Sequence, residues 1–315
     1  MRGNTKALLE IIKRENIGLV HARSRAPAWP ARAAARKVGI PFVTTYHGIY
    51  NGKTRLKIRY NAIMAKGDFV IANSEFTKAH ILKTHGIDPA KIITILRGVD
   101  MARFDPAIIK PGAKTALRQN WGISKTRPLL LLPGRVTRLK GHIVAIEALA
   151  ALRDEGISAD FVFLGDHAGR EDYVAEIKTK TSALDLDGNV HICGHCDDMP
   201  TALAASDVVI SASLQPESFG RIAAEAQAMQ KLVVATNHGG SRETIIDGQS
   251  GFLVAPGNAQ ALAAGIASVL ALRPAQRKAM GEAARKRIAE QFSDTRLKTA
   301  TLNVYQNAIA AHKAL

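Results

Sequence analysis

Short apolar runs alternate with longer amphipathic stretches along almost the whole chain. In the first third the apolar runs are rich in β-branched residues and end at turn formers, which predicts short buried strands. These runs occupy 17–21, 41–46, 68–73 and 92–96. Helical spacing of apolar residues predicts helices over 4–15 and 31–38. Alternating strands and helices are typical of a parallel sheet with helices on both faces.

The same alternation restarts after a polar stretch, 105–127, which is interpreted as an interdomain linker. Further strands are expected at 129–132, 161–164, 190–193, 207–213 and 232–235. A hairpin-like segment is expected at 251–254, and helices at 258–272, 275–291 and 295–313. The predicted fold class is therefore α/β, with two Rossmann-like parallel-sheet domains facing a cleft. The predicted domains are 1–110 and 111–296, and the C-terminal helix, 297–315, is expected to pack back on the first.

One stretch in the second half reads as a strand, a loop and a helix in succession. Residues 207–213 are apolar, 214–218 contain a proline and turn formers, and from Phe219 onward the residues favour a helix. The backbone N–H groups of Phe219, Gly220 and Arg221 are then expected at the helix N-terminus, without acceptors inside the helix. Such a helix end binds phosphate, and Gly220 allows close approach because it lacks a Cβ atom.

Two glutamates accompany this helix end. Glu217 precedes the helix and Glu225 lies within it. An ionised carboxylate only accepts hydrogen bonds, whereas sugars carry hydroxyl donors. The pair therefore indicates a ligand with both phosphate and hydroxyl groups. The alternative is a capped core helix with an unrelated glutamate, since short motifs also occur by chance.

A glycine turn with several cations follows the first expected strand of the second half. It runs from Gly134 through Arg135 and Lys140 to Gly141. Ligands bind at the carboxyl ends of strands in such sheets. The forked guanidinium of Arg135 and the compact charge of Lys140 suit a diphosphate. The spacing differs from that of a Walker loop, and the alternative interpretation is a basic surface turn.

Composition predicts a two-domain protein without a membrane span. The 315 residues are 47% hydrophobic, which is enough apolar material for two cores. No uncharged apolar stretch is long enough to cross a bilayer, and the charged N-terminal segment lacks the apolar core of a secretory signal. Two cysteines make no disulfide framework, so a reducing cytoplasmic location is expected.

The positive charge is concentrated in the first third of the chain. Residues 1–110 contain 20 basic and 7 acidic side chains, whereas residues 111–315 contain 23 and 20. The densest basic cluster, 53–59, is interleaved with apolar residues. This favours peripheral binding to an anionic membrane surface over a merely solvated helix face. Nucleic acid is not expected as a partner, because no recognition motif is present and aromatic residues make up 5% of the chain.

Cys193 and Cys196 have the spacing of a redox pair, and with His191 and His195 they could form half of a zinc site. A thioredoxin-like unit does not fit in the middle of a strand–helix series, and no second ligand pair follows. We therefore expect reduced, non-catalytic thiols and no metal site.

Several motifs occur together along nearly the whole chain. They are Gly134-Arg135 with Lys140-Gly141, Glu217 and Glu225 with seven residues between them, Gly239-Gly240 before Asp247-Gly248, His47-Gly48, and Gly98-Val99-Asp100. This ordered set resembles the retaining GT-B glycosyltransferases of family 4, also called glycosyltransferase group 1.

The resemblance implies that the second domain binds a nucleotide-diphosphate sugar. Arg135 and Lys140 would neutralise the diphosphate in place of a metal ion, so neither a metal nor a cofactor is expected. Glu225 would hold the ribose and Glu217 the sugar. The implied donor-binding residues are Gly134, Arg135, Lys140, Gly194, Glu217, Ser218, Phe219, Gly220, Arg221 and Glu225.

The resemblance also implies that His47, from the first domain, and Glu217 act as catalytic residues, with the acceptor attacking on the same face as the leaving group. Members of the family usually begin with a strand and a glycine-rich loop that precede the region matched here. The N-terminal domain is therefore interpreted as incomplete. Arg97 stands where the family commonly has asparagine, which adds a cation to that domain.

The predicted function is transfer of a sugar to an envelope glycan or lipid-linked acceptor of the lipopolysaccharide type, at the inner face of the cell membrane. Two alternatives remain. One is a non-catalytic module that binds nucleotide-sugars or a membrane surface. The other is a GT-B-like epimerase that acts on the sugar-nucleotide itself. Transfer by the purified chain would exclude the first, and isotope exchange at the sugar without acceptor would favour the second.

Overall fold

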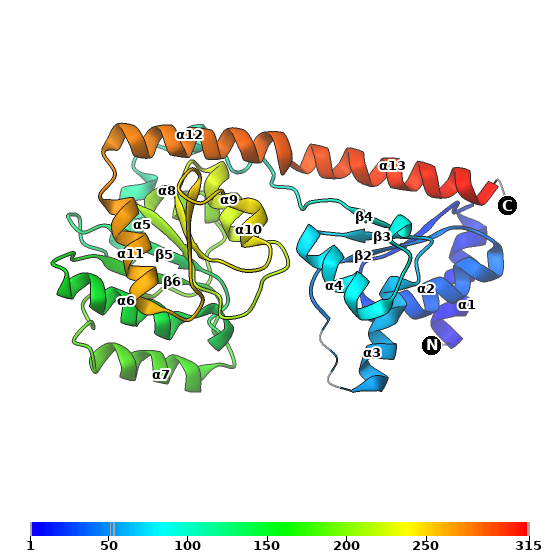
Figure 1. The fold of residues 1–315 in the computed structure, drawn as a ribbon, viewed down its shortest axis with the longest axis horizontal. Coiled ribbons are helices and arrows are strands. Elements are labelled where there is room, and N and C mark those ends of the chain that lie inside the picture. The colour runs from blue at the N-terminus through cyan, green and yellow to red at the C-terminus, as the bar shows by residue number, and fades with distance from the viewer. Residues whose placement is uncertain (1, 51, 53, 314–315) are drawn as a thin grey trace. The chain divides into compact units, whose positions relative to one another are not determined.

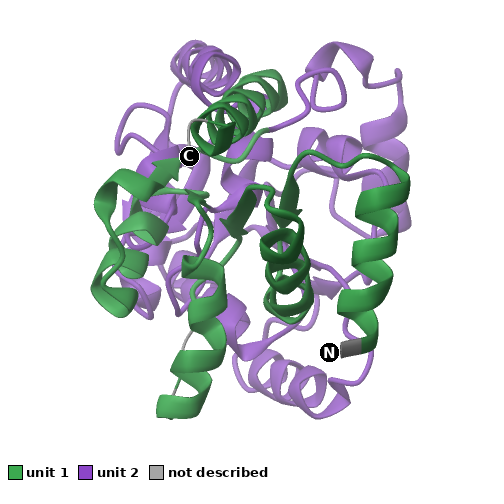
Figure 2. Cartoon of the chain, turned by 90° about the vertical axis from the view of Figure 1, so that its right-hand side faces the viewer, with its two compact units in different colours: residues 1–98, 294–315 green, residues 99–293 purple. Residues whose placement is uncertain are grey.

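The computed structural model describes residues 2–50, 52 and 54–313 and contains two compact units, each with its own parallel sheet (Figures 1 and 2). Unit 1 comprises Met1–Gly98 and Asp294–Leu315, and unit 2 comprises Val99–Ser293. The α/β class expected from the alternating pattern is confirmed in both units. None of the helices over the described residues combines the length and hydrophobicity needed to cross a bilayer.

Unit 1 is built on a four-stranded parallel sheet in the order β1-β2-β3-β4. Its strands are β1 (Val20–Ala22), β2 (Phe42–Tyr46), β3 (Phe69–Ala72) and β4 (Ile92–Thr94). Its helices are α1 (Arg2–Arg14), α2 (Arg25–Val38), α3 (Arg55–Asn61), η1 (Ala62–Ala65), α4 (Glu75–His85), η2 (Pro89–Lys91) and α13 (Asp294–Lys313).

Alternate residues of these strands face different helices. Phe42 and Tyr46 of β2 pack in a cluster with Ala31 of α2. Val43, between them, packs in a separate cluster with Val304 of α13. Because successive strand residues point to opposite faces, α2 and α13 cover opposite sides of this sheet. The C-terminal helix is thus part of the core of unit 1.

Helix α2 begins earlier than the sequence pattern predicts. The expected start was residue 31, after Pro30, but the helix begins at Arg25 behind the extended residue Ser24. Pro27 is the third residue of this helix, and proline is tolerated in a first helical turn because the amides there have no acceptor in the helix. The Ala28 amide donates to the Ser24 carbonyl at 3.2 Å, so the helical ladder is established before Pro30.

Unit 2 is built on a six-stranded parallel sheet in the order β10-β9-β8-β5-β6-β7. Its strands are β5 (Leu129–Pro133), β6 (Asp160–Leu164), β7 (Val190–Ile192), β8 (Val208–Ser211), β9 (Val233–Thr236) and β10 (Gly251–Val254). Its helices are η3 (Pro106–Ile108), α5 (Ala113–Asn120), η4 (Arg138–Lys140), α6 (His142–Asp154), α7 (Glu171–Ser182), α8 (Met199–Ala205), α9 (Arg221–Ala228), α10 (Ser241–Thr244), α11 (Ala259–Leu270) and α12 (Pro274–Gln291).

A large apolar core lies on one face of this sheet. Leu130 and Phe161, on neighbouring strands, pack there with Ile146 of α6 and Leu262 of α11. Segment 251–254, expected as part of a hairpin, is instead the edge strand β10, which pairs in parallel with β9. The hairpin prediction is wrong because the Gly251 backbone follows the β9 edge, where a Cβ atom would lie 2.5 Å from the Val233 carbonyl oxygen.

The division between the units falls after Gly98, whereas the sequence pattern places it after residue 110. Residues beyond Gly98 are tied to unit 2 by hydrogen bonds. The Val99 amide donates to the Phe292 carbonyl at 2.7 Å, and Arg285 donates to the Phe104 carbonyl at 2.7 Å. The polar stretch after residue 105 also carries η3 and α5, so it is a structured part of unit 2.

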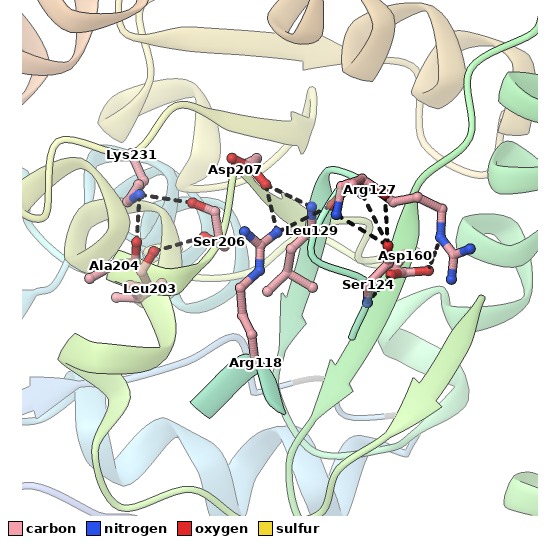
Figure 3. Close-up of polar contacts among 11 residues, drawn as sticks. Arg118, Ser124, Arg127, Leu129, Asp160, Leu203, Ala204, Ser206, Asp207 and Lys231 are labelled. Atoms are coloured by element: carbon pink, nitrogen blue, oxygen red, sulfur yellow. Dashed lines mark hydrogen bonds and ion pairs between the residues drawn. The ribbon is translucent and has the colours of Figure 1, made fainter. Parts of the chain in front are cut away.

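Charged side chains brace the amino ends of the unit 2 strands (Figure 3). The fully buried Asp160 accepts hydrogen bonds from Arg127 at 2.7 Å and from the Ser124 amide at 2.9 Å. Asp207 binds Arg118 at 2.9 Å and the Leu129 amide at 2.8 Å. These contacts hold the strands at the edge of the sheet opposite to the carboxyl ends.

Candidate functional site

The order of strands in unit 2 reverses between β5 and β8. The chain runs from β5 outward to β6 and β7, then returns to place β8 on the other side of β5. Leu131 of β5 lies opposite Val209 of β8 in a parallel register. Loops that leave such a pair of strands diverge and create the usual ligand site of doubly wound sheets. The glycine turn after β5 and the loop that carries Glu217 after β8 both begin at this point.

The glycine turn is closely packed on the end of β6. The Gly134 amide donates to the Leu164 carbonyl at 2.8 Å, and a Cβ atom on Gly165 would lie 2.1 Å from the Gly134 carbonyl oxygen. The side chain of Lys140 folds back over Gly134, so that its Cε lies 3.2 Å from where a Cβ would be. The Arg135 side chain is exposed to solvent.

Lys140 and Glu217 meet although 77 residues separate them. The Lys140 ammonium lies 2.5 Å from Glu217 Oε1, and the Ser213 hydroxyl donates to the same oxygen. The two charged side chains are 27% and 25% exposed, so the pair is partly shielded from water but open to a ligand. The structure therefore brings together the cation and the carboxylate that the sequence pattern assigns to one ligand.

The pKa of Glu217 reflects this pairing. Burial alone would raise the pKa, but the Lys140 charge and its hydrogen bond, followed by the Ser213 hydrogen bond and the nearby His238, outweigh it. The net result is a pKa below the ordinary value. Glu217 is therefore an ionised hydrogen-bond acceptor at neutral pH.

Two glycines let the neighbouring loops, after β5 and after β9, pack closely on the loop after β8. Gly141 has a φ of 74°, and a Cβ there would lie 2.1 Å from the Ala212 carbonyl oxygen. The Leu214 amide donates to the Leu139 carbonyl at 2.8 Å. Gly240, before α10, would place a Cβ 2.3 Å from the Phe219 Cα. These contacts fix the Glu217 loop from both sides.

Helix α9 begins at Arg221, two residues after the start at Phe219 that the sequence pattern predicts. Gly220 is its N-cap with a φ of 80°, a left-handed conformation that favours glycine. The Ala224 amide donates to the Gly220 carbonyl, and earlier amides of a helix have no acceptor within it. Phe219 is buried against Phe292, with ring centroids 5.9 Å apart, which anchors this helix end. Glu225 lies one turn into the helix and is half-buried.

Comparison with known proteins identifies the family to which this arrangement belongs. Residues 113–287 match the family described as glycosyl transferases group 1, and residues 1–103 match glycosyltransferase family 4. The chain belongs to the group 1 glycosyltransferases. The family resemblance predicted from the motifs is thereby confirmed.

Curated relatives of this chain are themselves named glycosyltransferases. A D-inositol 3-phosphate glycosyltransferase of Saccharomonospora viridis is 30% identical over 94% of this chain and 71% of the relative. The putative glycosyltransferase EpsD of Bacillus subtilis is 28% identical over 95% and 79%. The chain spans a smaller part of some relatives, 56% of the D-inositol 3-phosphate glycosyltransferase of Xylanimonas cellulosilytica.

Solved structures support the two-domain α/β class of this glycosyltransferase. A glycosyltransferase from Rickettsia africae has a TM-score of 0.91 and 38% identity, over 98% of this chain and 81% of that chain. Anabaena HepE in complex with UDP has a TM-score of 0.86 and 24% identity, over 96% and 82%, which is a likeness of fold. The predicted GT-B fold class is confirmed by these neighbours.

Gly194, assigned to the donor site by resemblance, follows the outermost strand β7. Its φ is 69°, and the His167 ring lies 4.0 Å from where its Cβ would be. Among residues 2–50, 52 and 54–313, no hydrogen bond or ion pair joins Gly194 to the Lys140–Glu217 pair, so its role in this glycosyltransferase stays a prediction. The sheet places it two strands from β5, at the same carboxyl edge.

The cysteines that flank Gly194 are free thiols. Burial, with a smaller contribution from Cys196, raises the pKa of Cys193 to about 11. The reactive thiolate is therefore disfavoured at neutral pH. Over the described residues, no group of three or more His, Cys, Asp or Glu side chains has the arrangement of a metal site.

His47 belongs to unit 1, whereas all the predicted donor-binding residues belong to unit 2. It follows the carboxyl end of β2, and its Nε2 accepts a hydrogen bond from Arg23 Nε at 3.1 Å. An acceptor nitrogen at Nε2 requires the neutral ring with its proton on Nδ1. The predicted catalytic role of His47 is not tested by this contact.

Two residues of the site were not anticipated from the sequence. Ser213 binds Glu217 directly, and His238 is close enough to lower the Glu217 pKa. Both ring nitrogens of His238 are buried, and no hydrogen-bond partner for them is found among the described residues. The position of Ser213 at the end of an expected strand, four residues before Glu217, is the sequence signal that could have identified it.

Proposed function

We propose that this glycosyltransferase transfers a sugar from a nucleotide-diphosphate sugar to an acceptor hydroxyl with retention of configuration at the anomeric carbon. The observation that carries the proposal is the Lys140–Glu217 contact at the point where the strand order reverses. It joins a cation for phosphate to a carboxylate for hydroxyl groups, beside the N-terminus of α9. Family membership supports the same activity.

The diphosphate is proposed to lie between the glycine turn and α9. The Lys140 ammonium has three N–H donors, so it can keep Glu217 and still donate to a phosphate oxygen. Arg135 is exposed beside it and adds a forked donor. Oε2 of Glu217 takes part in no hydrogen bond found among the described residues, which leaves it available to a sugar hydroxyl. Glu225 is assigned to the ribose.

In the proposed reaction the acceptor oxygen bonds to the anomeric carbon while the bond from that carbon to the diphosphate oxygen breaks. The acceptor proton passes to the leaving diphosphate on the same face, which gives retention. Negative charge develops on the diphosphate as the bond breaks, and Arg135 and Lys140 stabilise it in place of a divalent metal ion. Product configuration by NMR and turnover in excess EDTA test retention and metal independence.

Calorimetric titration with UDP, GDP and ADP tests the donor site. At least one nucleotide is expected to bind, and Lys140→Ala or Glu225→Ala should weaken that binding by tenfold or more. Arg138→Ala is the matched control, because Arg138 lies on the same turn but pairs with Glu176 and stacks on Tyr173. Unchanged affinity in both site variants would refute the assignment.

Turnover measurements distinguish the transferase from the two alternative functions of the same site. Transfer to an added acceptor supports the enzyme, whereas nucleotide-sugar binding without transfer or hydrolysis would identify a non-catalytic module. Solvent isotope exchange into the sugar without an acceptor would identify an epimerase. Replacing His47 by alanine should lower transfer with little change in nucleotide affinity, since His47 is proposed to act on the sugar.

The acceptor is proposed to be an envelope glycan or lipid-linked molecule at an anionic membrane surface. In α3, Leu56 is 80% exposed and lies one turn before Tyr60, which is 43% exposed. Arg55, Lys57 and Arg59 are exposed on the same helix, and Lys53 lies outside the described residues. Apolar side chains among cations suit insertion between anionic headgroups. A chain that stays in the supernatant with phosphatidylglycerol vesicles would exclude this partner.

A further inference from the structure

A cavity of about 540 Å³ lies in unit 2 at the amino ends of β8 and β9. Its lining comes from the residues that precede these two strands, from the end of α11 and from the first turns of α12. The candidate donor site lies at the opposite, carboxyl ends of the strands. The cavity is therefore separate from that site, and the proposed transferase reaction does not use it.

Lys231 lines this cavity, and its ammonium is bound to the end of α8 (Figure 3). Its Nζ donates to the carbonyl oxygens of Ala204 and Ser206, each at 2.8 Å. No third acceptor for this nitrogen is found among the residues that the structure describes. A lysine ammonium has three N–H donors, so one of them has no acceptor within this part of the protein.

This environment suits a neutral amine as well as an ammonium. A neutral amine has two N–H donors and a lone pair, so both hydrogen bonds survive the loss of the third proton. Burial does most to lower the pKa of Lys231 to about 8, whereas the charge of Asp207 raises it. Three cations lower it further: Lys114, Arg118 and Arg277. At pH 7.5 roughly a quarter of the Lys231 side chains are then neutral and nucleophilic.

The charge of the cavity favours an anionic reagent for this amine. The lining contains three cations and one carboxylate: Lys231, Arg277, Lys278 and Asp207. Asp207 is paired with Arg118 at 2.9 Å, and Lys278 lies 3.9 Å from Glu282. With these partners included, four cations face two carboxylates, so the positive charge of the cavity is not cancelled.

Arg277 provides donors for such an anion. Its Nη2 donates to the carbonyl oxygens of Val269 and Leu270, at 3.0 and 3.1 Å. These acceptors are neutral, so the guanidinium keeps its full charge. Its Nε is buried and has no hydrogen-bond partner within the described part of the chain. Because guanidinium groups bind phosphate through paired N–H donors, a phosphate held by Arg277 would lie in the cavity that Lys231 lines.

We propose that Lys231 is a site of acylation by small acyl phosphates, which carry both an anion for the cavity and an acyl group for the amine. The neutral amine attacks the acyl carbon, the bond from that carbon to the phosphate oxygen breaks, and the phosphate leaves with the electron pair. The nitrogen gives one proton to the departing phosphate, so the products are an N-acyl lysine and inorganic phosphate. The acylated nitrogen keeps a single N–H, so one of the two carbonyls at the end of α8 loses its donor.

Peptide mass spectrometry of the full chain treated with acetyl phosphate at pH 7.5 tests the proposal. Lys231 is expected to be acetylated about tenfold faster than Lys278, which lines the same cavity but has a side chain that is 77% exposed. The rate at Lys231 should rise to about pH 9 and then level off, because the amine is almost wholly neutral above its pKa of about 8. Acetylation of Lys231 no faster than that of Lys278 would overturn the proposal.

A neutral acylating reagent separates attraction of the phosphate from reactivity of the amine. N-acetoxysuccinimide carries no phosphate, so Arg277→Gln should slow the acetylation of Lys231 by acetyl phosphate about fivefold more than it slows acetylation by this ester. Arg277→Lys is the matched control, because it loses the same forked donor but keeps the positive charge, and the two reagents should then be affected equally. Lys278→Gln removes a charge of the same cavity from an exposed side chain and should also slow acetyl phosphate more than the ester. Equal slowing of both reagents in Arg277→Gln and in Lys278→Gln would refute acyl phosphates as the reagent.

Discussion

At the scale of single residues, Glu217 and His142 show how pairing and burial set the charge of side chains near the proposed donor site. Glu217 is held ionised by Lys140 and Ser213 despite its partial burial. His142, at the start of α6 after the glycine turn, is fully buried against Phe163, with ring centroids 4.8 Å apart. Burial lowers the pKa of His142 to about 4. One group is therefore kept charged and the other neutral.

Removing the Lys140 charge should reverse the direction of the Glu217 pKa shift. In Lys140→Met the burial of Glu217 is no longer outweighed by a paired ammonium, so its pKa should rise above the ordinary value. A ¹³C NMR titration of the Glu217 carboxyl carbon measures this. In the control Arg138→Met the pKa of Glu217 should stay low, and a low pKa in Lys140→Met would contradict the assigned cause.

The buried His142 should make unit 2 sensitive to acid. The unfolded chain takes up a proton at this residue below its ordinary pKa of 6.5, whereas the folded chain does so only near 4. Stability from neutral His142 is therefore complete above pH 6.5 and is lost as the pH falls toward 4. Between pH 7 and pH 5 the unaltered chain should lose about 2 kcal/mol more of its unfolding free energy than His142→Phe loses.

Urea denaturation at the two pH values measures this difference. His195→Asn is the control, because the His195 side chain is 71% exposed. It should show the same acid sensitivity as the unaltered chain. An unchanged pH dependence in His142→Phe would mean that other groups govern acid unfolding.

At the scale of elements, the two ends of the unit 2 strands differ: one end carries the candidate site and the other carries ion pairs. The carboxyl ends of β5 and β8 lead into the loops that hold Lys140 and Glu217. The amino ends carry the ion pairs of Figure 3, Arg127 with Asp160 and Arg118 with Asp207. The two pairs have similar lengths but different burial, since the Asp160 side chain is 0% exposed and that of Asp207 is 35% exposed.

The burial of the paired aspartate should therefore determine how much each arginine contributes to the free energy of unfolding. Arg127→Ala leaves the Asp160 carboxylate enclosed without its cation, and the expected loss of unfolding free energy is about 3 kcal/mol. Arg118→Ala leaves Asp207 accessible to water, and the expected loss is about 1 kcal/mol. Chemical denaturation of both variants gives the comparison, with Arg118→Ala as the matched control. Equal losses would show that the enclosure of Asp160 is unimportant.

Elements with a regular pattern were predictable from the sequence, and those fixed by distant partners were not. The helices expected at 275–291 and 295–313 correspond to α12 and α13, because both segments are long and rich in residues that favour a helix. Whether 251–254 forms a hairpin or an edge strand depends on its parallel pairing with β9, which the local sequence does not specify. The early start of α2 was not predicted, because two prolines in its first turns are residues that usually interrupt a helix.

At the scale of the whole molecule, distance along the chain limited what the sequence could predict of the sites. Local motifs placed Lys140 and Glu217 near one ligand, but their direct contact spans 77 residues. The cavity that Lys231 lines could not be predicted, since it requires the first turns of α12 beside the residues that precede β9. Charge, by contrast, is a property of composition, and its concentration in residues 1–110 was evident at once.

That concentration of charge should make vesicle binding depend on salt. Binding to phosphatidylglycerol vesicles at 0.1 M salt should be lost at 1 M, since the screening length falls from about 10 Å to about 3 Å. Lys57→Glu, on α3, should weaken binding more than Lys278→Glu, an equal change of charge on the exposed face of α12. Co-sedimentation measures both effects. Equal weakening by the two variants would argue against a specific role for α3.

The order in which the units can form follows from the position of α13. Unit 2 is one continuous segment, so its core can be completed while the ribosome is still adding residues. Unit 1 begins synthesis first but needs Val304 and Ala308 of α13 to cover one face of its sheet. That face of the sheet therefore stays uncovered until α13 has been synthesised. Chaperone contacts with the nascent chain should accordingly concentrate on β2 and β3, whose residues Val43 and Ile71 pack against α13 in the folded unit.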